Sequence, residues 1–332
     1  MGRNEGTVQH TIYLVASCSD RKCGVIHETL QLRALRATAP SRRAEQWWRR
    51  LAETDDTPRT PALRLYGGEH WTHARRSLAT LIERGYSAEL WAASAGYGLV
   101  PASARLRPYS ATFSCGSPDS VAQAGVSRVE QMQRWWAALA EYPGPEAGAP
   151  RSLHALASRD SLATLIIVAA PHYIRAQRID LLAARRALVT PSQLIVVSNH
   201  ELLADTELAP NLIPVDERCQ TVVGGTMVGL NARVAHRLLA GGPITAPCLR
   251  GRYDEMVCGA GRPDKHSRDR MGDEEVLTFL RAGLRQDPRA GWTVLLRALR
   301  GDGRACEQRR LRALHGQVRE ELASAGPGDD RR

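Results

Sequence analysis

Residues 11–16 read TIYLVA, and the next six residues, 17–22, read SCSDRK. The first stretch is short, apolar and rich in residues that favour strands, whereas the second is polar. Together they predict a buried strand that opens into a polar loop. The same pattern recurs further along, where ELWAA at 89–93 precedes SAGYGLVP at 94–101. We therefore expect the fold to be built from strands that each lead into a polar loop.

Helical stretches separate these strands from two more, at 164–169 and 193–197. Apolar periodicity indicates helices at 47–51, 70–84, 129–142, 152–157 and 172–186. Strands that alternate with helices predict an α/β fold, with a mainly parallel sheet and flanking helices. Ligands in open sheets of this kind bind beyond the carboxyl ends of the strands. Polar loops are expected at such ends at 17–22, 94–98, 171–173, 198–200 and 216–231.

Composition changes near residue 240, and this change predicts the domain boundaries. We place an α/β ligand-binding or catalytic domain at 8–240. Residues 241–272 are rich in Gly, Pro and Arg with little periodicity, which predicts a linker. Residues 273–325 contain three helical stretches, the last two joined by a tight turn at 301–303. This layout predicts a small C-terminal domain that resembles a helix-turn-helix.

The charge balance favours a polyanionic partner. Forty-five Lys and Arg residues against 35 Asp and Glu residues leave a net charge of +10. Two of the basic residues are lysines, Lys22 and Lys265. Because arginine takes the basic position almost everywhere else, Lys22 is a candidate for chemistry that needs a titratable amine. The alternative is an ordinary surface lysine.

DNA is the polyanion that the C-terminal domain favours. Ten arginines against three acidic residues between 281 and 319 give this stretch a local charge of +7. In a helix-turn-helix the last helix enters a DNA groove, where its side chains contact phosphates and base edges. The candidates for these contacts are Arg304, Gln308, Arg309 and Arg312. The alternative is an arginine-rich, solvated helix pair that closes the catalytic domain.

Several protein classes are disfavoured by the sequence. No apolar run approaches the roughly 18 to 20 residues of a membrane span, and MGRNEGTVQH at 1–10 lacks the apolar core of a signal peptide. We therefore expect a cytoplasmic protein with no membrane partner. The seven scattered cysteines show no CxxC spacing, so we expect reduced thiols and no metal. Motifs of P-loop, dinucleotide, HExxH and EF-hand sites are lacking, and no cofactor is expected.

The loop after the first strand holds the candidate catalytic residues. Cys18 lies between Ser17 and Ser19, with Lys22 downstream. A nearby cation lowers the pKa of a thiol and makes it a better nucleophile. Cys18 is therefore a candidate nucleophile, Lys22 its electrostatic partner or proton donor, and the two serines substrate-positioning groups. A packing or positioning role for Cys18, in a cradle for an anion or nucleobase, is the alternative.

The later loops supply candidate substrate-binding residues. Two glycines allow a sharp turn after the second strand, so the backbone there can approach a planar ligand while Tyr97 offers a stacking face. Tyr109 is expected to line the same pocket, although a tyrosine half-buried against a loop is equally typical. Asp216 and Asn231 flank a Gly-rich stretch, where they either bind polar ligand atoms or serve as turn and helix residues. The candidates in these loops are Ser94, Gly96, Tyr97, Gly98, Tyr109, Asp216 and Asn231.

The motifs S-C-S-x-x-K at 17–22 and S-A-x-x-G-L-V at 94–100, followed by the Pro108-Tyr109 pair, resemble a known group. The sequence is similar over residues 10–115 to uncharacterised bacterial proteins near the YaaA peroxide-stress group and DpdC, and to the core domain of archaeosine synthase. The resemblance implies association with nucleic acids and 7-deazaguanine bases. Archaeosine synthase acts on a cyano-deazaguanine base in tRNA, and DpdC is linked to conversion of the same nitrile to an amide in DNA.

If the resemblance holds, Cys18 or Lys22 acts at the base and the 94–98 loop helps to hold it. The tRNA-binding domain of archaeosine synthases has no counterpart here. We therefore expect a nucleic-acid-associated enzyme of DNA modification or defence, a base-modifying hydrolase or amidotransferase-like enzyme acting on a modified purine. The alternative is a non-enzymatic DNA-binding or nucleotide-sensing regulator. A third reading, a glycosidic-bond enzyme, needs a carboxylate in the pocket, for which Asp20 and Asp216 are candidates.

Overall fold

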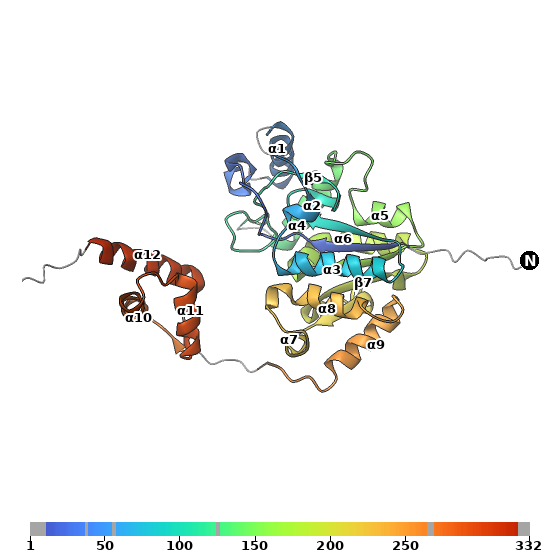
Figure 1. Cartoon of the computed structure of the whole chain (residues 1–332). Coiled ribbons are helices and arrows are strands. Elements are labelled where there is room, and N and C mark those ends of the chain that lie inside the picture. The colour runs from blue at the N-terminus through green and yellow to red at the C-terminus, as the bar shows by residue number, and fades with distance from the viewer. Residues whose placement is uncertain (1–10, 37–38, 55–57, 124–126, 264–268, 325–332) are drawn as a thin grey trace, which may run out of the picture. The chain divides into compact units, whose positions relative to one another are not determined.

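The computed structural model of the chain describes residues 11–36, 39–54, 58–123, 127–263 and 269–324 (Figure 1). The chain divides into two compact units, residues 1–263 and 264–332. The first unit has an α/β fold and the second is helical, which confirms the predicted fold class. No described helix combines the length and apolar character needed to cross a membrane.

The first unit is built on a six-stranded sheet with the order β4-β3-β1-β6-β7-β8. The strands β3, β1, β6, β7 and β8 run parallel, and β4 pairs antiparallel with β3 at one edge. The strand bounds are β1 Ile12–Ser17, β3 Ala88–Ser94, β4 Gly98–Pro101, β6 Thr164–Val168, β7 Leu194–Asn199 and β8 Leu212–Val215.

The strand β1 lies inside the sheet. All six of its residues are buried, and Leu14 is in register with Leu90 of β3 and Ile166 of β6. A strand covered on both faces reads as a continuous apolar run, and this explains why TIYLVA shows no alternation.

Two groups of helices cover the faces of the sheet (Figure 1). In one group α3 and α8 pack on each other and on the sheet, with α7 and α9 beside them. In the other group α6 packs on α4 and α5, and α4 packs on α1. The bounds are α1 Pro40–Glu53, α3 Glu69–Glu83, α4 Arg128–Glu141, α5 Leu153–Arg159, α6 Pro171–Ala187, α7 Arg218–Val223, α8 Leu230–Leu239 and α9 Ala246–Val257.

Short elements connect this framework near its α1 side. The two-residue strands β2 (Thr60–Pro61) and β5 (Arg105–Leu106) pair antiparallel, and α2 (Ala62–Leu65) follows β2 directly. Tyr66 ends α2 and forms an isolated bridge with Lys22 of the loop after β1. This bridge brings the segment around Tyr66 to the carboxyl end of β1.

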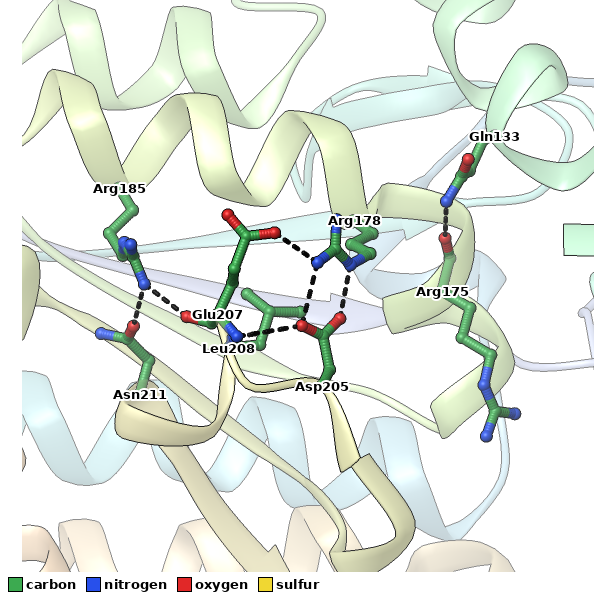
Figure 2. A network of polar contacts seen from close by, with 8 residues as sticks. All are labelled: Gln133, Arg175, Arg178, Arg185, Asp205, Glu207, Leu208 and Asn211. Atoms are coloured by element: carbon green, nitrogen blue, oxygen red, sulfur yellow. Dashed lines mark hydrogen bonds and ion pairs between the residues drawn. The ribbon is translucent and has the colours of Figure 1, made fainter. Parts of the chain in front are cut away.

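A polar network fixes helix α6 to the segment that links β7 and β8 (Figure 2). Arg178 makes ion pairs with Asp205 and Glu207, and Arg185 donates to the carbonyl oxygen of Glu207 and to the side chain of Asn211. At the opposite side of the helix, Gln133 of α4 donates to the carbonyl oxygen of Arg175. Because α6 is held on both sides, the residues of its first turn have a fixed position beside β6.

The second unit has its own apolar core. Helices α10 (Asp273–Gln286), α11 (Trp292–Gly301) and α12 (Gln308–Ser324) contribute Val276, Leu280, Leu299, Leu311 and Val318, each of which is fully buried. Two-residue strands β9 (Asp269–Arg270) and β10 (Arg304–Ala305) pair in parallel. Three helices around one core, the last two joined by a tight connection, are the layout expected from the sequence.

The structure corrects two boundaries. The predicted linker at 241–272 contains α9, whose residues Leu249, Tyr253 and Val257 are buried in the core of the first unit. These residues recur every four positions, a helical stripe that the abundant Gly, Pro and Arg obscured. The last helix was predicted at 305–322 with Arg304 along or beside its face, but α12 begins at Gln308 and Arg304 lies in β10.

Candidate functional site

The reversal of strand order in the sheet marks the region where a ligand is expected. From β1 the chain passes to β3 on one side of β1 and then to β6 on the other. The carboxyl ends of β1 and β6 therefore flank a topological switch point, at which open α/β sheets bind their ligands. Ser17 ends β1 and Cys18 follows it, while Tyr173 lies in the first turn of α6, just beyond β6.

Cys18 and Tyr173 meet at this point. The Cys18 Sγ atom lies 3.1 Å from the Tyr173 Oη atom, within hydrogen-bonding distance, although the residues are 155 positions apart. The backbone N–H of Cys18 donates to the carbonyl oxygen of Ala93, which aligns the thiol with the end of β3. Cys18 is 7% exposed and Tyr173 4% exposed, so the thiol is held in a largely dry environment.

Two further buried phenols extend the cluster. The Oη atoms of Tyr66 and Tyr109 lie 3.1 Å apart, and the Ser94 Oγ atom lies 2.6 Å from the Tyr109 Oη atom. Burial, and next the Cys18 thiol, raise the pKa of Tyr66, Tyr109 and Tyr173 well above the ordinary value. All three phenols therefore stay protonated at neutral pH and supply O–H donors around the sulfur. We call Cys18, Lys22, Tyr66, Ser94, Tyr109 and Tyr173 the thiol cluster.

Lys22 places an amine in the same cluster. Its Nζ atom donates to the carbonyl oxygen of Ser19 at 2.9 Å and lies 4.3 Å from the centroid of the Tyr109 ring. Burial lowers the pKa of Lys22, against the opposing attraction of Cys18 and Asp20. A buried amine with a lowered pKa exchanges its proton more readily near neutral pH than a surface lysine does.

The two serines beside Cys18 hold different positions. The Ser17 Oγ atom lies 3.2 Å from the Nε2 atom of His70, and both side chains are buried. Burial lowers the pKa of His70 to about 4, so its imidazole is neutral at pH 7. Ser19 is half-buried, and its hydroxyl donates to the carbonyl oxygen of Arg21 at 2.8 Å, which shapes the loop. Ser17 thus links the end of β1 to His70 of α3, whereas Ser19 stabilises the loop that follows β1.

The loop at 94–98 packs against the ring of Tyr109 through Gly96 and Tyr97. The Ser94 hydroxyl accepts hydrogen bonds from the backbone N–H groups of Gly96 and Tyr97. A Cβ atom at Gly96 would lie 2.4 Å from the Tyr109 ring, so glycine is needed there for close contact. The Tyr97 ring packs edge-on against Tyr109, 5.2 Å between centroids, and Gly98 has a φ of +71°. Tyr97 and Tyr109 are both buried, so they line the site from within the core.

Asp216 and Asn231 have structural partners outside the thiol cluster. Asp216 binds the guanidinium group of Arg218, with a contact of 2.8 Å. Asn231 donates from Nδ2 to the carbonyl oxygen of Ala169 at 2.9 Å, and so joins the start of α8 to the end of β6. These contacts correspond to the turn and helix roles that the sequence left open.

Three residues of this region were not singled out from the sequence. Tyr173 falls in a loop that was expected at this edge of the sheet, but nothing marked its phenol. Tyr66 and His70 arrive from distant segments, through the bridge to Lys22 and through α3. Asp20 is exposed at the rim, and its negative charge raises the pKa of Lys22 and of His172 against the effect of their burial.

The second unit exposes the predicted DNA-contacting side chains. Arg304, Gln308, Arg309 and Arg312 are all exposed. Arg310 pairs with Asp273 and Arg281 pairs with Glu321, whereas none of the described carboxylates pairs with Arg304, Arg309 or Arg312. Arg312 lies 5.9 Å from the Trp292 ring. The arginines without an ion-pair partner are therefore available to an external anion.

Comparison with family models, with curated proteins and with solved structures finds no significant match. All seven cysteines lie in the described ranges, and each is a free thiol. Within those ranges, no three His, Cys, Asp or Glu side chains lie close enough together to hold a metal ion.

Proposed function

We propose that the α/β unit is an enzyme that modifies a purine-like base in DNA, and that the helical unit supplies affinity for the DNA. The main support is the position of the Cys18 thiol at the switch point of the sheet, 3.1 Å from the Tyr173 phenol. Lys22 adds a second proton donor within the same cluster. The resemblance to proteins of 7-deazaguanine chemistry supports the choice of base.

The proposed chemistry begins with addition of the Cys18 sulfur to an electrophilic carbon of the base, such as the nitrile carbon of a cyano-deazaguanine. The S–C bond forms as one π bond of the nitrile breaks, and the nitrogen takes up the proton, which gives a thioimidate. Tyr173 or Lys22 donates that proton, and the thiol proton passes back to the donor. Water then adds to the thioimidate carbon and the S–C bond breaks, which releases the amide and restores the thiol.

The test of this function is turnover by the full-length protein on a duplex oligonucleotide that carries 7-cyano-7-deazaguanine, with the base analysed by mass spectrometry. We expect the mass of the base to rise by one water, and Cys18→Ala to abolish the change. Lys22→Ala is expected to slow it by a factor on the order of 10² to 10⁴, the usual contribution of a positioned proton donor. Turnover retained in both variants would remove these residues as catalysts.

A sensor that binds the base without changing it is the second candidate, and the burial of Cys18 favours it. A thiol that is only 7% exposed is better suited to packing against a ligand than to attacking one, unless the loop opens. In this case the wild-type protein would bind the modified oligonucleotide tightly and return it unaltered. The same mass measurement therefore separates the two candidates.

A further inference from the structure

Helices α3 and α8 pack side by side, and their facing side chains make successive contacts along the interface (Figure 1). At the start of α3, the Glu69 carboxylate forms an ion pair with Arg233 of α8 and accepts a hydrogen bond from the Thr226 hydroxyl. One turn further along both helices, the ring centroids of His73 and His236 lie 5.6 Å apart. Opposite charges therefore meet in the first contact, whereas two basic side chains meet in the second. We call His73 and His236 the histidine pair.

Arg76 adds a third basic group to the histidine pair. It lies three residues after His73 on α3, and residues with this spacing are neighbours on the surface of a helix. Burial, then His236 and then Arg76 lower the pKa of His73, and Arg233 lowers it further while Glu69 raises it. Burial, followed by Arg76, lowers the pKa of His236. Both imidazoles are therefore mostly neutral at pH 7.

Hydrogen bonds within the protein do not account for the histidine pair. The structure gives neither ring nitrogen of His73 a hydrogen-bond partner among the described residues, and its Nδ1 atom is buried. The Nε2 atom of His236 lies 3.4 Å from the Thr80 hydroxyl, a long contact. Glu69 is the one described carboxylate whose charge acts on His73, and it already pairs with Arg233. The two imidazoles thus have hydrogen-bonding capacity that the described protein groups leave unused.

An external anion would complement these groups. A negative charge beside an imidazole favours its protonated form, so a bound anion raises the pKa of both histidines and makes them cationic donors. His73 and His236 are half-buried and Arg76 is exposed, so a ligand can reach them from solvent. Phosphate suits this arrangement, because it has enough oxygens to accept from two imidazoles and from the planar fork of an arginine at once.

We propose that the interface of α3 and α8 at His73, Arg76 and His236 is a binding site for a phosphate group. Arg76 binds two of the phosphate oxygens, and the two imidazolium groups donate to the others. The Thr80 hydroxyl beside His236 is a further donor. The phosphate belongs to a small ligand or to the backbone of DNA, and the same side chains serve both. Cys18 takes no part in this site, so the proposal does not depend on the proposed function.

Isothermal titration calorimetry of the full-length protein with inorganic phosphate tests the site. We expect saturable binding that Arg76→Gln and His236→Gln each weaken about tenfold, because each variant loses a charge-assisted hydrogen bond. Arg75→Gln is the matched control, the same substitution at the neighbouring exposed residue of α3. It should leave the affinity unchanged, since Arg75 is not among the charges that act on the histidine pair.

The affinity for an anion should also depend on pH. Inorganic sulfate is the probe for this measurement, because its charge stays constant between pH 6 and pH 8. Binding of the anion takes up protons on His73 and His236, so the affinity should rise as pH falls through this range. The rise should be smaller in His236→Gln and equal to that of the wild type in Arg75→Gln.

A duplex oligonucleotide identifies the source of the phosphate. If the site contacts the DNA backbone, fluorescence anisotropy across a salt series should give Arg76→Gln a smaller salt slope than the wild type or Arg75→Gln. Equal slopes, together with weakened binding of inorganic phosphate by Arg76→Gln, would assign the site to a small ligand that carries a phosphate group.

Four results would overturn the proposal. The first is the absence of saturable phosphate binding together with equal DNA salt slopes in the wild type and Arg76→Gln. The second is equal phosphate affinity in the wild type, Arg76→Gln and His236→Gln. The third is equal weakening by Arg75→Gln and Arg76→Gln, and the fourth is a sulfate affinity that does not change with pH. Cys18→Ala should retain the phosphate affinity of the wild type, so this site and the proposed enzyme can fail separately.

Discussion

Cys18 combines two properties that rarely coincide in one thiol. It is buried, yet it lies beside proton donors: the Tyr173 phenol is 3.1 Å from its sulfur, and the Tyr109 phenol interacts with it and carries the Lys22 amine 4.3 Å from its ring centroid. An ordinary core cysteine packs among apolar side chains and needs no such partners. In a site with little water, the same donors can stabilise negative charge as it develops on a substrate. The polar surroundings of Cys18 therefore support a role beyond packing.

His70 should make the stability of the α/β unit depend on pH. Its folded pKa of about 4 lies below the ordinary value of 6.5 because burial disfavours the imidazolium. The unfolded chain therefore binds a proton first as pH falls, so the free energy of unfolding should fall between about pH 6.5 and pH 4, by up to about 3 kcal/mol. Above that window His70 contributes no pH dependence.

Urea unfolding at pH 5 and pH 7, followed by tryptophan fluorescence, measures this effect. His70→Gln should show a smaller loss of unfolding free energy between the two pH values than the wild type. The exposed His154 is the matched control, and His154→Gln should behave as the wild type does. An identical pH dependence in His70→Gln would contradict the assignment.

Gly96 should not tolerate a larger side chain. A Cβ atom there would meet the Tyr109 ring at 2.4 Å, and neither partner can move freely because Tyr109 is fully buried. We expect Gly96→Ala to reduce the free energy of unfolding by about 1 to 3 kcal/mol, the usual cost of overpacking. Gly251→Ala, in the exposed helix position where a Cβ meets nothing, should be neutral or slightly stabilising. Equal effects of the two substitutions in chemical denaturation would refute the close contact.

At the scale of elements, the position of the site depends on how α6 and the strand ends are held. The Arg178 network joins α6 to the segment after β7, and the bridge between Lys22 and Tyr66 joins the loop after β1 to the end of α2. Both links act between segments distant in sequence. They bring Tyr173 and Tyr66 close to Cys18, and no local sequence motif predicts these contacts.

Helix α9 contributes buried residues to the core of the α/β unit, and substitution of one of them tests this placement. Leu249 is 1% exposed, and its neighbour in the stripe, Tyr253, donates its hydroxyl to the carbonyl oxygen of Pro214 in β8. Leu249→Ala should destabilise the unit by about 2 to 5 kcal/mol, because it leaves a cavity. Glu255→Ala, at an exposed position of the same helix, should change stability little. Melting temperatures equal to that of the wild type for both variants would contradict the placement of Leu249 in the core.

The sequence predicts most of the sheet but not all of the site. Strands such as β1 and β6 can be recognised in the sequence because buried parallel strands are continuous apolar runs. The short β8 is interrupted by Pro214 and was not predicted. Cys18 is predictable because it directly follows a strand, whereas His70 and Tyr66 become neighbours of that strand end only through tertiary packing. The fold decides which polar residues converge, and local patterns carry no signal for contacts such as Lys22 with Tyr66 or Ser17 with His70, which join residues far apart in the sequence.

At the scale of the whole molecule, the proposed function assigns base modification to the α/β unit and DNA binding to the helical unit. Each has its own apolar core, as expected of a separately folding domain. The α/β unit holds the thiol cluster, and the helical unit exposes arginines that no described carboxylate neutralises. A modifying enzyme that acts on one rare base benefits from a second unit that keeps it on DNA, because nonspecific phosphate contacts raise the local concentration of target sites.

The DNA affinity of the full-length protein should depend on salt and on the helical unit. We expect log Kd to rise linearly with log salt concentration, because phosphate contacts release counterions. Replacing Arg309 and Arg312 together by Gln should weaken binding uniformly across sequences and reduce the salt slope by about one per lost phosphate contact. Arg186→Gln, in the α/β unit, should leave the slope unchanged. Fluorescence anisotropy with a duplex oligonucleotide gives these slopes, and equal slopes in all three proteins would exclude α12 as the contact.

The most direct test of the central claim is to look for the covalent bond at Cys18. The full-length protein would be incubated with a duplex oligonucleotide that carries 7-cyano-7-deazaguanine, quenched rapidly and digested, and its peptides analysed by mass spectrometry. We expect a base adduct on the peptide that contains Cys18, absent in Cys18→Ala and retained in Cys23→Ala, a substitution at an exposed cysteine five residues away. Wild-type rates of base conversion by Cys18→Ala, with no adduct on the wild-type peptide, would contradict it.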